Sequence, residues 1–345
     1  MKKIIDRLEE KMILPKEEIL RLLTTEDEDS VEYLFERARA IKEENYGKKI
    51  YIRGLIEFTN YCKNDCYYCG IRRSNTKAQR YRLTEEEILL CCQKGYKLGF
   101  RTFVLQGGED LFWTDEKLCH IVERIHRSFP DCAITLSIGE RAFESYKKLY
   151  EAGADRYLLR HETSCEQHYG RLHPINLSLK NRISCLKSLK RIGFQTGCGF
   201  MVGSPFQTLE NICEDLIFIK EFSPEMVGIG PFIPHKDTPF GNYKKGSAGL
   251  TLKSLAITRL MLPKVLLPST TALGTALEDG RMRGVLAGAN VIMPNLSPKE
   301  VRKKYLLYDD KIATGDEAAE SIESLKKSME KIGYCIVTDR GDYLK

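Results

Sequence analysis

The sequence of 345 residues lacks several features that would assign it to common classes of protein. No apolar run approaches the roughly 20 residues of a membrane-spanning helix. The N-terminal segment becomes charged before an apolar signal core develops. Despite a net charge of +6, the basic residues form no long block, so a nucleic-acid partner is not indicated. We therefore expect a cytoplasmic protein with neither a membrane nor a nucleic acid as its partner.

Internal repeats, low-complexity tracts and linkers rich in proline or glycine are also absent, which predicts one compact fold. The apolar fraction of 42% is sufficient for a sizeable core. Cysteine, in contrast, is plentiful, with 12 residues. Because disulfide frameworks are rare in the reducing cytoplasm, we expect these cysteines to be core thiols, metal ligands, or both.

Three regions differ in their pattern of apolar residues. Residues 1–48 are highly charged and have helical periodicity, which predicts an N-terminal helical extension. Residues 49–296 alternate short β-rich runs with amphipathic helices, as parallel βαβ units do. Residues 297–345 contain two polar helical segments, at 298–307 and 316–332, and are expected to form a C-terminal helical cap packed on the preceding region.

The middle region predicts a (β/α)8 TIM barrel, which needs eight strands and intervening helices. The expected strands are residues 50–58, 101–106, 133–138, 156–161, 195–202, 226–232, 267–272 and 290–293. The expected helices are residues 84–98, 115–128, 141–152, 176–192, 208–222, 251–262 and 279–287. An open doubly wound sheet is the alternative, but no G-x-G-x-x-G motif follows the first strand to favour it.

Three cysteines follow the first expected strand with the spacing C-x3-C-x2-C: Cys62, Cys66 and Cys69. Their loop lies at the C-terminal end of a strand, where barrel enzymes place their chemistry. Three thiolates can hold three irons of a [4Fe-4S] cluster and leave the fourth iron open. An open iron can chelate the amino and carboxylate groups of S-adenosylmethionine (SAM). One electron from the cluster can then cleave SAM and release a 5′-deoxyadenosyl radical.

Three ordinary thiols and a zinc site are the alternatives for this motif. A tetrahedral zinc site needs a fourth Cys or His, and the next candidates, Cys91 and Cys92, lie inside an expected helix. The pattern therefore favours an iron–sulfur cluster, and zinc stays the alternative. We expect the remaining cysteines to be buried thiols without a metal.

Two further strand ends carry residues that are suited to bind SAM. Gly107 and Gly108 follow Gln106 at the end of the second strand, where glycine lets the backbone approach a ligand closely. Glu162 follows the fourth strand and can pair with the SAM ammonium group. Arg182 on the next helix can bind the SAM carboxylate. A structural ion pair at the barrel rim is the alternative for these two charged side chains.

Several stretches between about residue 50 and residue 310 closely resemble the HydE family of [FeFe]-hydrogenase maturases. They are the cysteine motif, Arg80–Thr84, Arg156–Thr163, Met226–His235, Asp237–Pro239 and Ala289–Asn295. Biotin synthase and methylornithine synthase belong to the same wider group but fit these stretches less well. The resemblance implies a complete barrel that encloses a large cavity, with SAM and one [4Fe-4S] cluster at its top.

The resemblance also implies roles for particular residues. Those expected to bind SAM are Tyr68, Gln106, Gly107, Gly108, Ser137, Glu162, Arg182, Met201, Ile229, Tyr305 and Leu307. Glu162 and Arg182 resemble the clamp for the amino-acid part of SAM, and Tyr68 is one of the residues expected around its adenosine. The polar positions that resemble the family's anion-accepting sites for the substrate are Thr135, Arg160, Thr270 and Thr271.

The sequence departs from the family pattern at two places. Some family members carry a second cysteine cluster near the C-terminus, but the corresponding stretch, Asp310–Asp316, contains no cysteine and only Cys335 lies downstream. We predict that no second iron–sulfur cluster is present. At Gly107 the resemblance leads us to expect a serine, so one hydroxyl contact would be missing.

The resemblance implies a maturase that helps to build the di-iron subcluster of the hydrogenase active site. Its implied substrate is a small organometallic molecule, a cysteine-bound iron dicarbonyl cyanide complex from the maturase HydG, and its product would pass to HydF. No pair of side chains indicates acid–base catalysis of the central step, so the protein would contribute positioning and exclusion of water. The alternatives are a radical SAM mutase acting on an amino acid, as methylornithine synthase does, and a non-catalytic iron–sulfur carrier.

Overall fold

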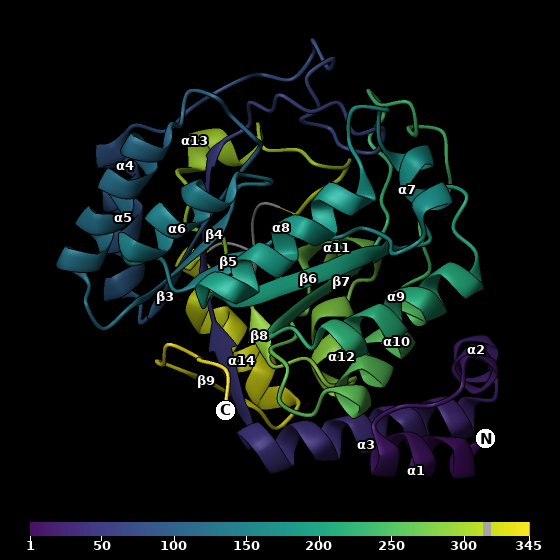
Figure 1. Ribbon diagram of the computed structural model, residues 1–345. Coiled ribbons are helices and arrows are strands. Elements are labelled where there is room, and N and C mark those ends of the chain that lie inside the picture. Colours follow the sequence, from purple (N-terminus) through teal and green to yellow (C-terminus); the bar gives the residue numbers. More distant parts are fainter. Residues whose placement is uncertain (313–318, 345) are drawn as a thin grey trace.

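The computed structural model describes residues 1–312 and 319–344, and it shows parallel strands surrounded by helices (Figure 1). One sheet contains strands in the order β2-β3-β4-β5-β6-β7, and a second has the order β8-β1-β9. Every strand pair in both sheets is parallel. The strands are β1 (Lys49–Ile52), β2 (Gly54–Thr59), β3 (Thr102–Gly107), β4 (Ala133–Ser137), β5 (Arg156–Leu158), β6 (Gln195–Val202), β7 (Met226–Pro231), β8 (Val291–Ile292) and β9 (Cys335–Val337).

Isolated bridges connect the two sheets into a ring. The bridged pairs are Met226–Leu266, Pro268–Val291 and Leu55–Asn295, all of them parallel. Single backbone hydrogen bonds accompany these bridges, such as the one that the Leu55 N–H donates to the Pro294 carbonyl at 2.9 Å. The expected α/β fold, with parallel strands that follow one another around a barrel, is therefore confirmed. Its closure depends on short contacts and not on a continuous ladder.

The expectation of a strand at residues 267–272 is wrong. Leu266 and Pro268 form one bridge each, and a helix begins at Thr271. Proline has no N–H group with which to continue the ladder toward β7, although the Ser269 N–H still donates to the Val291 carbonyl at 2.9 Å. The Thr270 hydroxyl then accepts a hydrogen bond from the Leu273 N–H at 3.3 Å and caps the helix. Thr270 and Thr271 thus lie at a helix N-terminus.

Helices cover the outer face of the strands (Figure 1). They are α4 (Glu85–Lys97), α5 (Asp115–Ser128), α6 (Phe143–Glu151), α7 (Glu166–Leu172), α8 (Leu179–Ile192), α9 (Leu209–Phe222), α10 (Ala248–Met261), α11 (Thr271–Ala276) and α12 (Gly280–Leu286). Side-chain caps explain several of their starts. Thr84, for example, accepts from the Glu87 N–H at 3.2 Å, and the Glu87 carboxylate accepts from the Thr84 N–H at 2.7 Å.

The structure differs from the expected elements in a few places. Arg53 divides the first expected strand into β1 and β2, while α7, α11 and β9 were not expected. The expected helix at 298–307 is only one turn, α13 (Lys299–Arg302). The expected helix at 316–332 is α14 (Ile322–Lys331), preceded by a 3-10 turn (Ala319–Ser321), and residues 316–318 lie outside the described residues. Within the described chain, no helix is both long enough and apolar enough to cross a membrane.

The N-terminal helices α1 (Lys2–Lys11), α2 (Lys16–Thr24) and α3 (Glu28–Tyr46) lie together beside α10 and α12 (Figure 1). Their periodic apolar side chains, including Ile5, Leu8 and Leu22, are buried against the barrel helices. The Lys42 amino group of α3 lies 3.4 Å from the centre of the Tyr334 ring and so connects this region to the C-terminal part of the chain. The division into an extension, a barrel and a cap stays a prediction.

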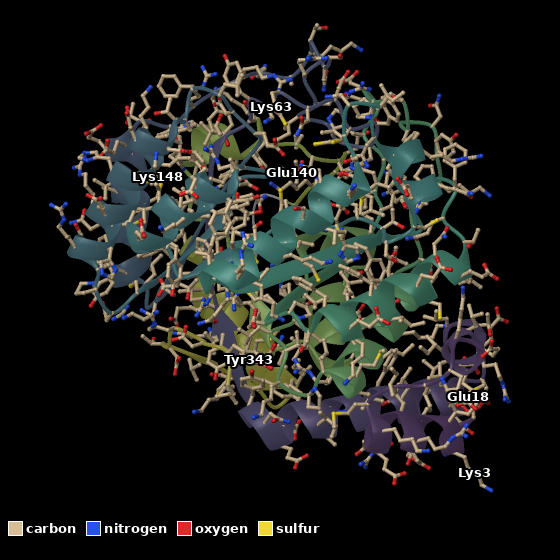
Figure 2. All side chains as sticks on the ribbon, in the orientation of Figure 1. Lys3, Glu18, Lys63, Glu140, Lys148 and Tyr343 are labelled. Carbon is tan, nitrogen blue, oxygen red and sulfur yellow. The ribbon has the colours of Figure 1, made fainter. Side chains whose placement is uncertain are left out.

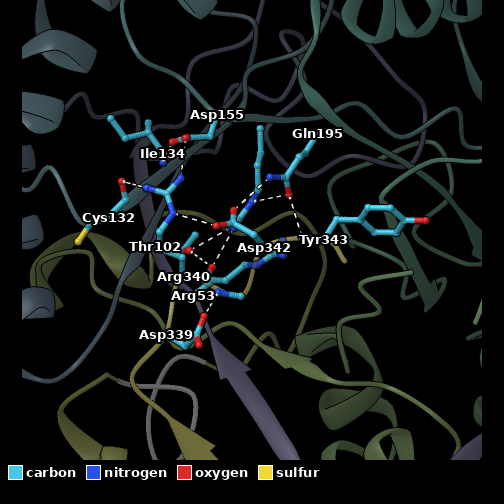
Figure 3. Close-up of polar contacts among 12 residues, drawn as sticks. Arg53, Thr102, Cys132, Ile134, Asp155, Gln195, Asp339, Arg340, Asp342 and Tyr343 are labelled. Carbon is cyan, nitrogen blue, oxygen red and sulfur yellow. Dashed lines mark hydrogen bonds and ion pairs between the residues drawn. The ribbon is translucent and has the colours of Figure 1, made fainter. Parts of the chain in front are cut away.

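The C-terminal tail closes the end of the barrel that lies opposite the cysteine loop. In Figure 2 Lys63 of the cysteine loop lies near the top of the molecule, and Tyr343 of the tail lies well below it. The buried Arg156 side chain of β5 donates hydrogen bonds to the Arg340 carbonyl at 2.8 Å and to the Asp342 carboxylate at 2.6 Å. Figure 3 shows Arg340 and Asp342 of the tail among their polar contacts with Asp155 and Gln195. Strand β9 pairs with β1 and directs the tail to this position.

Replacement of Asp342 by Asn tests the energetic role of this closure. Burial alone would raise the pKa of Asp342, but the charge of Arg156 and hydrogen bonds from Arg156, Gln195 and Arg340 lower it to about 2. A lowered carboxyl pKa stabilises the fold above the ordinary value of 3.8, and this contribution is lost as the pH falls toward 2. D342N should lower the free energy of unfolding by about 1–3 kcal/mol at pH 7.

The measurement is chemical denaturation of both proteins between pH 7 and pH 2, in which the difference should shrink below about pH 4. The exposed Asp339 of the same tail has no ionic partner among the described side chains, so D339N is the matched control. An equal loss of stability in D342N and D339N would contradict this account of the tail.

Candidate functional site

The cysteine loop follows β2 and opens into a cavity that we call the central cavity. Cys62, Cys66 and Cys69 are half-buried free thiols, and all three line this cavity of about 290 Å³. Arg80 holds the loop from outside, because its guanidinium donates to the carbonyls of Ile71 at 2.9 Å and Arg72 at 2.6 Å. A larger groove of about 1070 Å³ lies beyond Gly70, but none of the three cysteines borders it.

The three thiols suit a metal cluster. Burial raises the pKa of Cys69 to about 12, and the neighbouring Cys62 adds to the effect. Burial likewise raises the pKa of Cys66, with further contributions from Cys69 and Cys62. Thiolates that repel one another in this way are stabilised when a bound cation shares their charge. The donor set and its spacing therefore fit the [4Fe-4S] cluster that the sequence predicts.

The end of β3 forms one side of the central cavity at close range to this loop. A Cβ atom at Gly108 would overlap the Tyr61 carbonyl and lie 2.7 Å from Cys62 Cβ, so only glycine allows the loop to approach. A Cβ atom at Gly107 would lie 2.7 Å from Thr59 Cγ2. Thr59 thus occupies the space that the serine expected from the resemblance would need. Gly107 and Thr59 are a matched pair in this chain.

Glu162 reaches the cavity through an unusual backbone conformation. Its φ of 65° lies in the left-handed region, which costs of order 1–3 kcal/mol for a residue other than glycine. Two hydrogen bonds with the backbone of Gly199 hold this conformation. The Glu162 N–H donates to the Gly199 carbonyl at 3.0 Å, and the Gly199 N–H donates to His161 Nδ1 at 3.2 Å. With His161 turned outward into the core, Arg160 and Glu162 both line the cavity.

The two inward side chains retain hydrogen-bonding capacity. Arg160 Nη2 lies 3.1 Å from Glu162 Oε2, which is within ion-pair range but outside hydrogen-bond geometry. Arg160 Nε also has no hydrogen-bond partner among the described residues, and neither does the buried hydroxyl of Thr135. Buried polar atoms without a partner are costly, so such groups indicate a ligand that would complete them.

Arg182 is held at the cavity by partners on two loops. Its Nε donates to Glu140, and its Nη1 donates to the Arg160 carbonyl at 2.6 Å. Glu140 in turn accepts from the Asn181 amide at 2.6 Å. Glu140 lies directly after the Gly139 turn that follows β4, at the same end of the molecule as Lys63 (Figure 2). The guanidinium is therefore pre-oriented before any ligand binds.

Tyr305 also lines the central cavity, and its segment is held by a buried ion pair. Gln106 Nε2 donates to the Tyr305 hydroxyl at 3.4 Å. Lys311 donates to the Tyr305 carbonyl at 3.1 Å and to the carboxylate of Glu57 in β2. Asn295 completes the carboxylate by donating to Glu57 Oε2 at 2.8 Å. Both charged side chains are almost fully buried, so the segment after α13 is pinned to the barrel.

The structure brings together most of the residues expected at the site. Those that line the central cavity are Cys62, Cys66, Tyr68, Cys69, Gln106, Gly107, Gly108, Ser137, Arg160, Glu162, Arg182, Met201, Thr270, Tyr305 and Leu307. Ile229, Thr135 and Thr271 do not line it: Ile229 and Thr135 are buried within strands, and Thr271 is the first residue of α11.

Several residues that organise the site were not found from the sequence. Glu140 had a signal, since it is a charged residue directly after an expected strand, but Glu57 and Lys311 had none. They are 254 residues apart, and only the folded chain shows that they form a pair. Tyr308 also lines the cavity, and it directly follows the segment 298–307 that was expected to be helical.

Comparison with known proteins agrees with this geometry. Residues 56–219 match the radical SAM superfamily. The chain is 43% identical to the [FeFe] hydrogenase maturase subunit HydE of Thermotoga maritima over 332 residues, which cover 96% of this chain and 94% of that protein. It is 29% identical to 3-methylornithine synthase of Methanosarcina acetivorans, over 95% of this chain and 93% of that protein.

Solved structures show how widely this fold is shared. Methylornithine synthase (PylB) superposes with a TM-score of 0.86 at 26% identity, over 97% of each chain. The [FeFe]-hydrogenase maturase HydG has a TM-score of 0.79 at 22% identity, over 97% of this chain and 75% of that one. At 22% identity this second likeness concerns the fold alone.

The match to the superfamily begins in β2 and ends in α9, so it contains the cysteine loop and the strand ends on which Glu162 and Arg160 lie. The protein is thus a radical SAM enzyme. Its identity to the Thermotoga maritima protein extends over nearly the whole length of both chains. The chain belongs to the HydE family of [FeFe]-hydrogenase maturases.

Replacement of Lys311 by Met tests whether the buried ion pair holds the cavity wall. K311M leaves Glu57 buried without its cation, which should lower the free energy of unfolding by about 3–5 kcal/mol. The double variant K311M/E57Q removes both charges and should recover a large part of this loss. Denaturant unfolding measures both effects, with K303M, an exposed lysine near the same segment, as the control. A double variant that is less stable than K311M would contradict the role of the pair.

Proposed function

We propose that this protein reductively cleaves SAM and uses the 5′-deoxyadenosyl radical in assembly of the di-iron subcluster of [FeFe]-hydrogenase. The observation that carries this proposal is that the three cysteines, the Gly107–Gly108 turn, Glu162 and Arg182 all line one cavity. Parallel barrels place their chemistry at the C-terminal ends of the strands, and these residues lie at or after the ends of β2, β3 and β5, or on α8 in the case of Arg182.

Cys62, Cys66 and Cys69 would hold one [4Fe-4S] cluster, which supplies the electron for cleavage of SAM when it is bound. Glu162 is suited to bind the SAM ammonium group, because its Oε2 has no hydrogen-bond donor among the described residues. Arg182 is suited to bind the SAM carboxylate, because Glu140 and the Arg160 carbonyl fix its orientation. Tyr68, Tyr305 and Leu307, which line the same cavity, are suited to lie against the adenosine.

The substrate side of the cavity favours an anionic molecule. Arg160 lines the cavity with free hydrogen-bonding capacity, and the hydroxyl-bearing Thr270 lines it as well. Such groups suit the cyanide and carboxylate of a small iron–carbonyl–cyanide–cysteine complex. We propose that HydG supplies this complex and that HydF accepts the product. Exclusion of water from the cavity during the reaction would protect both the radical and the complex.

We further propose that the chain holds no second cluster. The stretch at Asp310–Asp316 contains no cysteine, although its residues 313–316 lie outside the described residues. A mutase acting on an amino acid is the second candidate, because PylB shares the fold over nearly all of both chains. The higher identity to HydE, 43% against 29%, favours the maturase.

SAM cleavage is tested after anaerobic reconstitution with iron and sulfide. With a reductant and SAM, the wild type should form 5′-deoxyadenosine, which liquid chromatography quantifies, and its iron and sulfide content should match one [4Fe-4S] cluster. C66A should reduce the product to the level of an enzyme-free control. C119A, which removes a half-buried thiol in α5 outside the cavity, should leave it unchanged. Stoichiometric zinc without 5′-deoxyadenosine would refute the radical reaction.

The maturase activity is tested by complementation. A host that expresses an [FeFe]-hydrogenase but lacks its own HydE should regain hydrogenase activity with the wild-type chain and not with E162Q, because the variant loses the charge that pairs with the SAM ammonium group. Hydrogenase activity and the infrared bands of the carbonyl and cyanide ligands are the readouts. SAM cleavage without complementation, together with rearrangement of an amino acid, would assign the chain to the mutases instead.

A further inference from the structure

The segment at the end of α7 is docked onto the cysteine loop at two points. The Tyr67 N–H donates to the Leu172 carbonyl at 3.0 Å. The second contact joins the residues that follow Tyr67 and Leu172. The Tyr68 hydroxyl lies 3.2 Å from His173 Nε2. Tyr68 lies between Cys66 and Cys69 and lines the central cavity, whereas His173 lies behind it and does not. His173 therefore does not reach the cavity itself but contacts Tyr68, which lines it.

The hydrogen bonds of His173 determine which of its nitrogens carries the proton. His173 Nδ1 lies 3.0 Å from the Tyr169 carbonyl. A carbonyl oxygen only accepts hydrogen bonds, so Nδ1 must carry the hydrogen. In a neutral imidazole Nε2 is then an acceptor, and the Tyr68 hydroxyl must donate to it. The hydrogen bond therefore runs from the Tyr68 hydroxyl to His173 Nε2 and not in the other direction.

The surroundings of His173 keep the imidazole neutral. Burial, with the positive charge of Arg182 as the next cause, lowers the pKa of His173 to about 3. The ring is only 1% exposed. At pH values near neutrality His173 therefore remains an acceptor for Tyr68, since a protonated imidazole would carry two donors and no acceptor.

Aromatic packing restricts both rings in addition to the hydrogen bonds. The His173 ring stacks on Tyr169, with ring centres 4.0 Å apart and planes at 23°. The Tyr68 ring meets His173 edge-on, with centres 5.5 Å apart and planes at 88°. The imidazole thus has one orientation, and it presents Nε2 to the Tyr68 hydroxyl.

We propose that His173 is a positioning residue for SAM: its neutral imidazole accepts a hydrogen bond from Tyr68 and so fixes the Tyr68 ring and the Cys66–Cys69 turn against the central cavity. This inference rests on the proposed function, because it assumes that SAM binds beside Tyr68. It adds a role for α7, which contributes no residue to the cavity wall.

The test is a double-mutant cycle of His173 and Tyr68. H173F keeps a ring for stacking but removes both hydrogen bonds, whereas H173Q retains one donor and one acceptor. Loss of one hydrogen bond corresponds to about a 3–10-fold weaker interaction, so H173F should raise the KM for SAM by about this factor with little change in kcat. H173Q should remain within about 2-fold of the wild type. In a Y68F background, H173F should have no further effect.

A control is available on α7, the helix that ends just before His173. His168 is buried on α7, but its Nε2 lies 3.1 Å from the Pro205 carbonyl and it does not line the cavity. H168F should therefore leave the KM for SAM unchanged. A second readout is the electron paramagnetic resonance signal of the reduced cluster, whose change on addition of SAM should be altered in H173F and restored in H173Q.

Two results would overturn the proposal: an equal effect of H173F with and without the Tyr68 hydroxyl, or H173Q as impaired as H173F. The proposed function fails separately if the wild type forms no 5′-deoxyadenosine. Positioning is then read without turnover, by hydrogen exchange of the peptide that spans residues 62–72. Exchange should be faster in H173F than in H173Q, and equal exchange in the two variants would refute the positioning role.

Discussion

Several charged side chains of the barrel, such as Glu57, Lys311 and Arg156, are buried or nearly so, and the shape of the site depends on how they are paired. Glu57 with Lys311 fixes the Tyr305 wall, and Glu140 orients Arg182 toward the cavity. An unpaired charge in such surroundings is expensive, which makes each pairing close to obligatory in the folded chain. At the opposite end, Arg156 of β5 ties the C-terminal tail to the barrel by the same principle. Buried ion pairs thus fix the segment of Tyr305 and the C-terminal tail against the barrel.

The groups available to ligands are those whose hydrogen bonds the described residues do not complete. Arg160 and Glu162 face the cavity with hydrogen-bonding capacity that no described residue uses. Glu162 also holds a strained backbone conformation that two hydrogen bonds through Gly199 and His161 maintain. Strain that is maintained by its surroundings is characteristic of functional sites. The barrel therefore separates charges that complete the fold from charges that remain available for SAM and substrate.

Much of the site could be predicted because its chemistry is local in the sequence. The spacing of Cys62, Cys66 and Cys69 after a strand contains the cluster motif, and Glu162 and the Gly107–Gly108 turn also follow strands directly. Parallel strands bring such residues to one end of the barrel regardless of how far apart they are in the chain. The expected strand at 267–272 failed because apolar residues suggest a strand while Pro268 removes the N–H that pairing needs.

The sequence by itself determined the class of protein, since residue types, spacing and order along the barrel are all written in the chain. Only the tertiary structure decided which side chains hold the site in place. Lys311 contacts Glu57 across 254 positions, and His173 meets Tyr68 because α7 docks on the cysteine loop. The tertiary structure also showed that Thr59 occupies the space beside Gly107. The physical reason is that such pairings arise from packing between distant segments, for which neither periodicity nor motif spacing carries a signal.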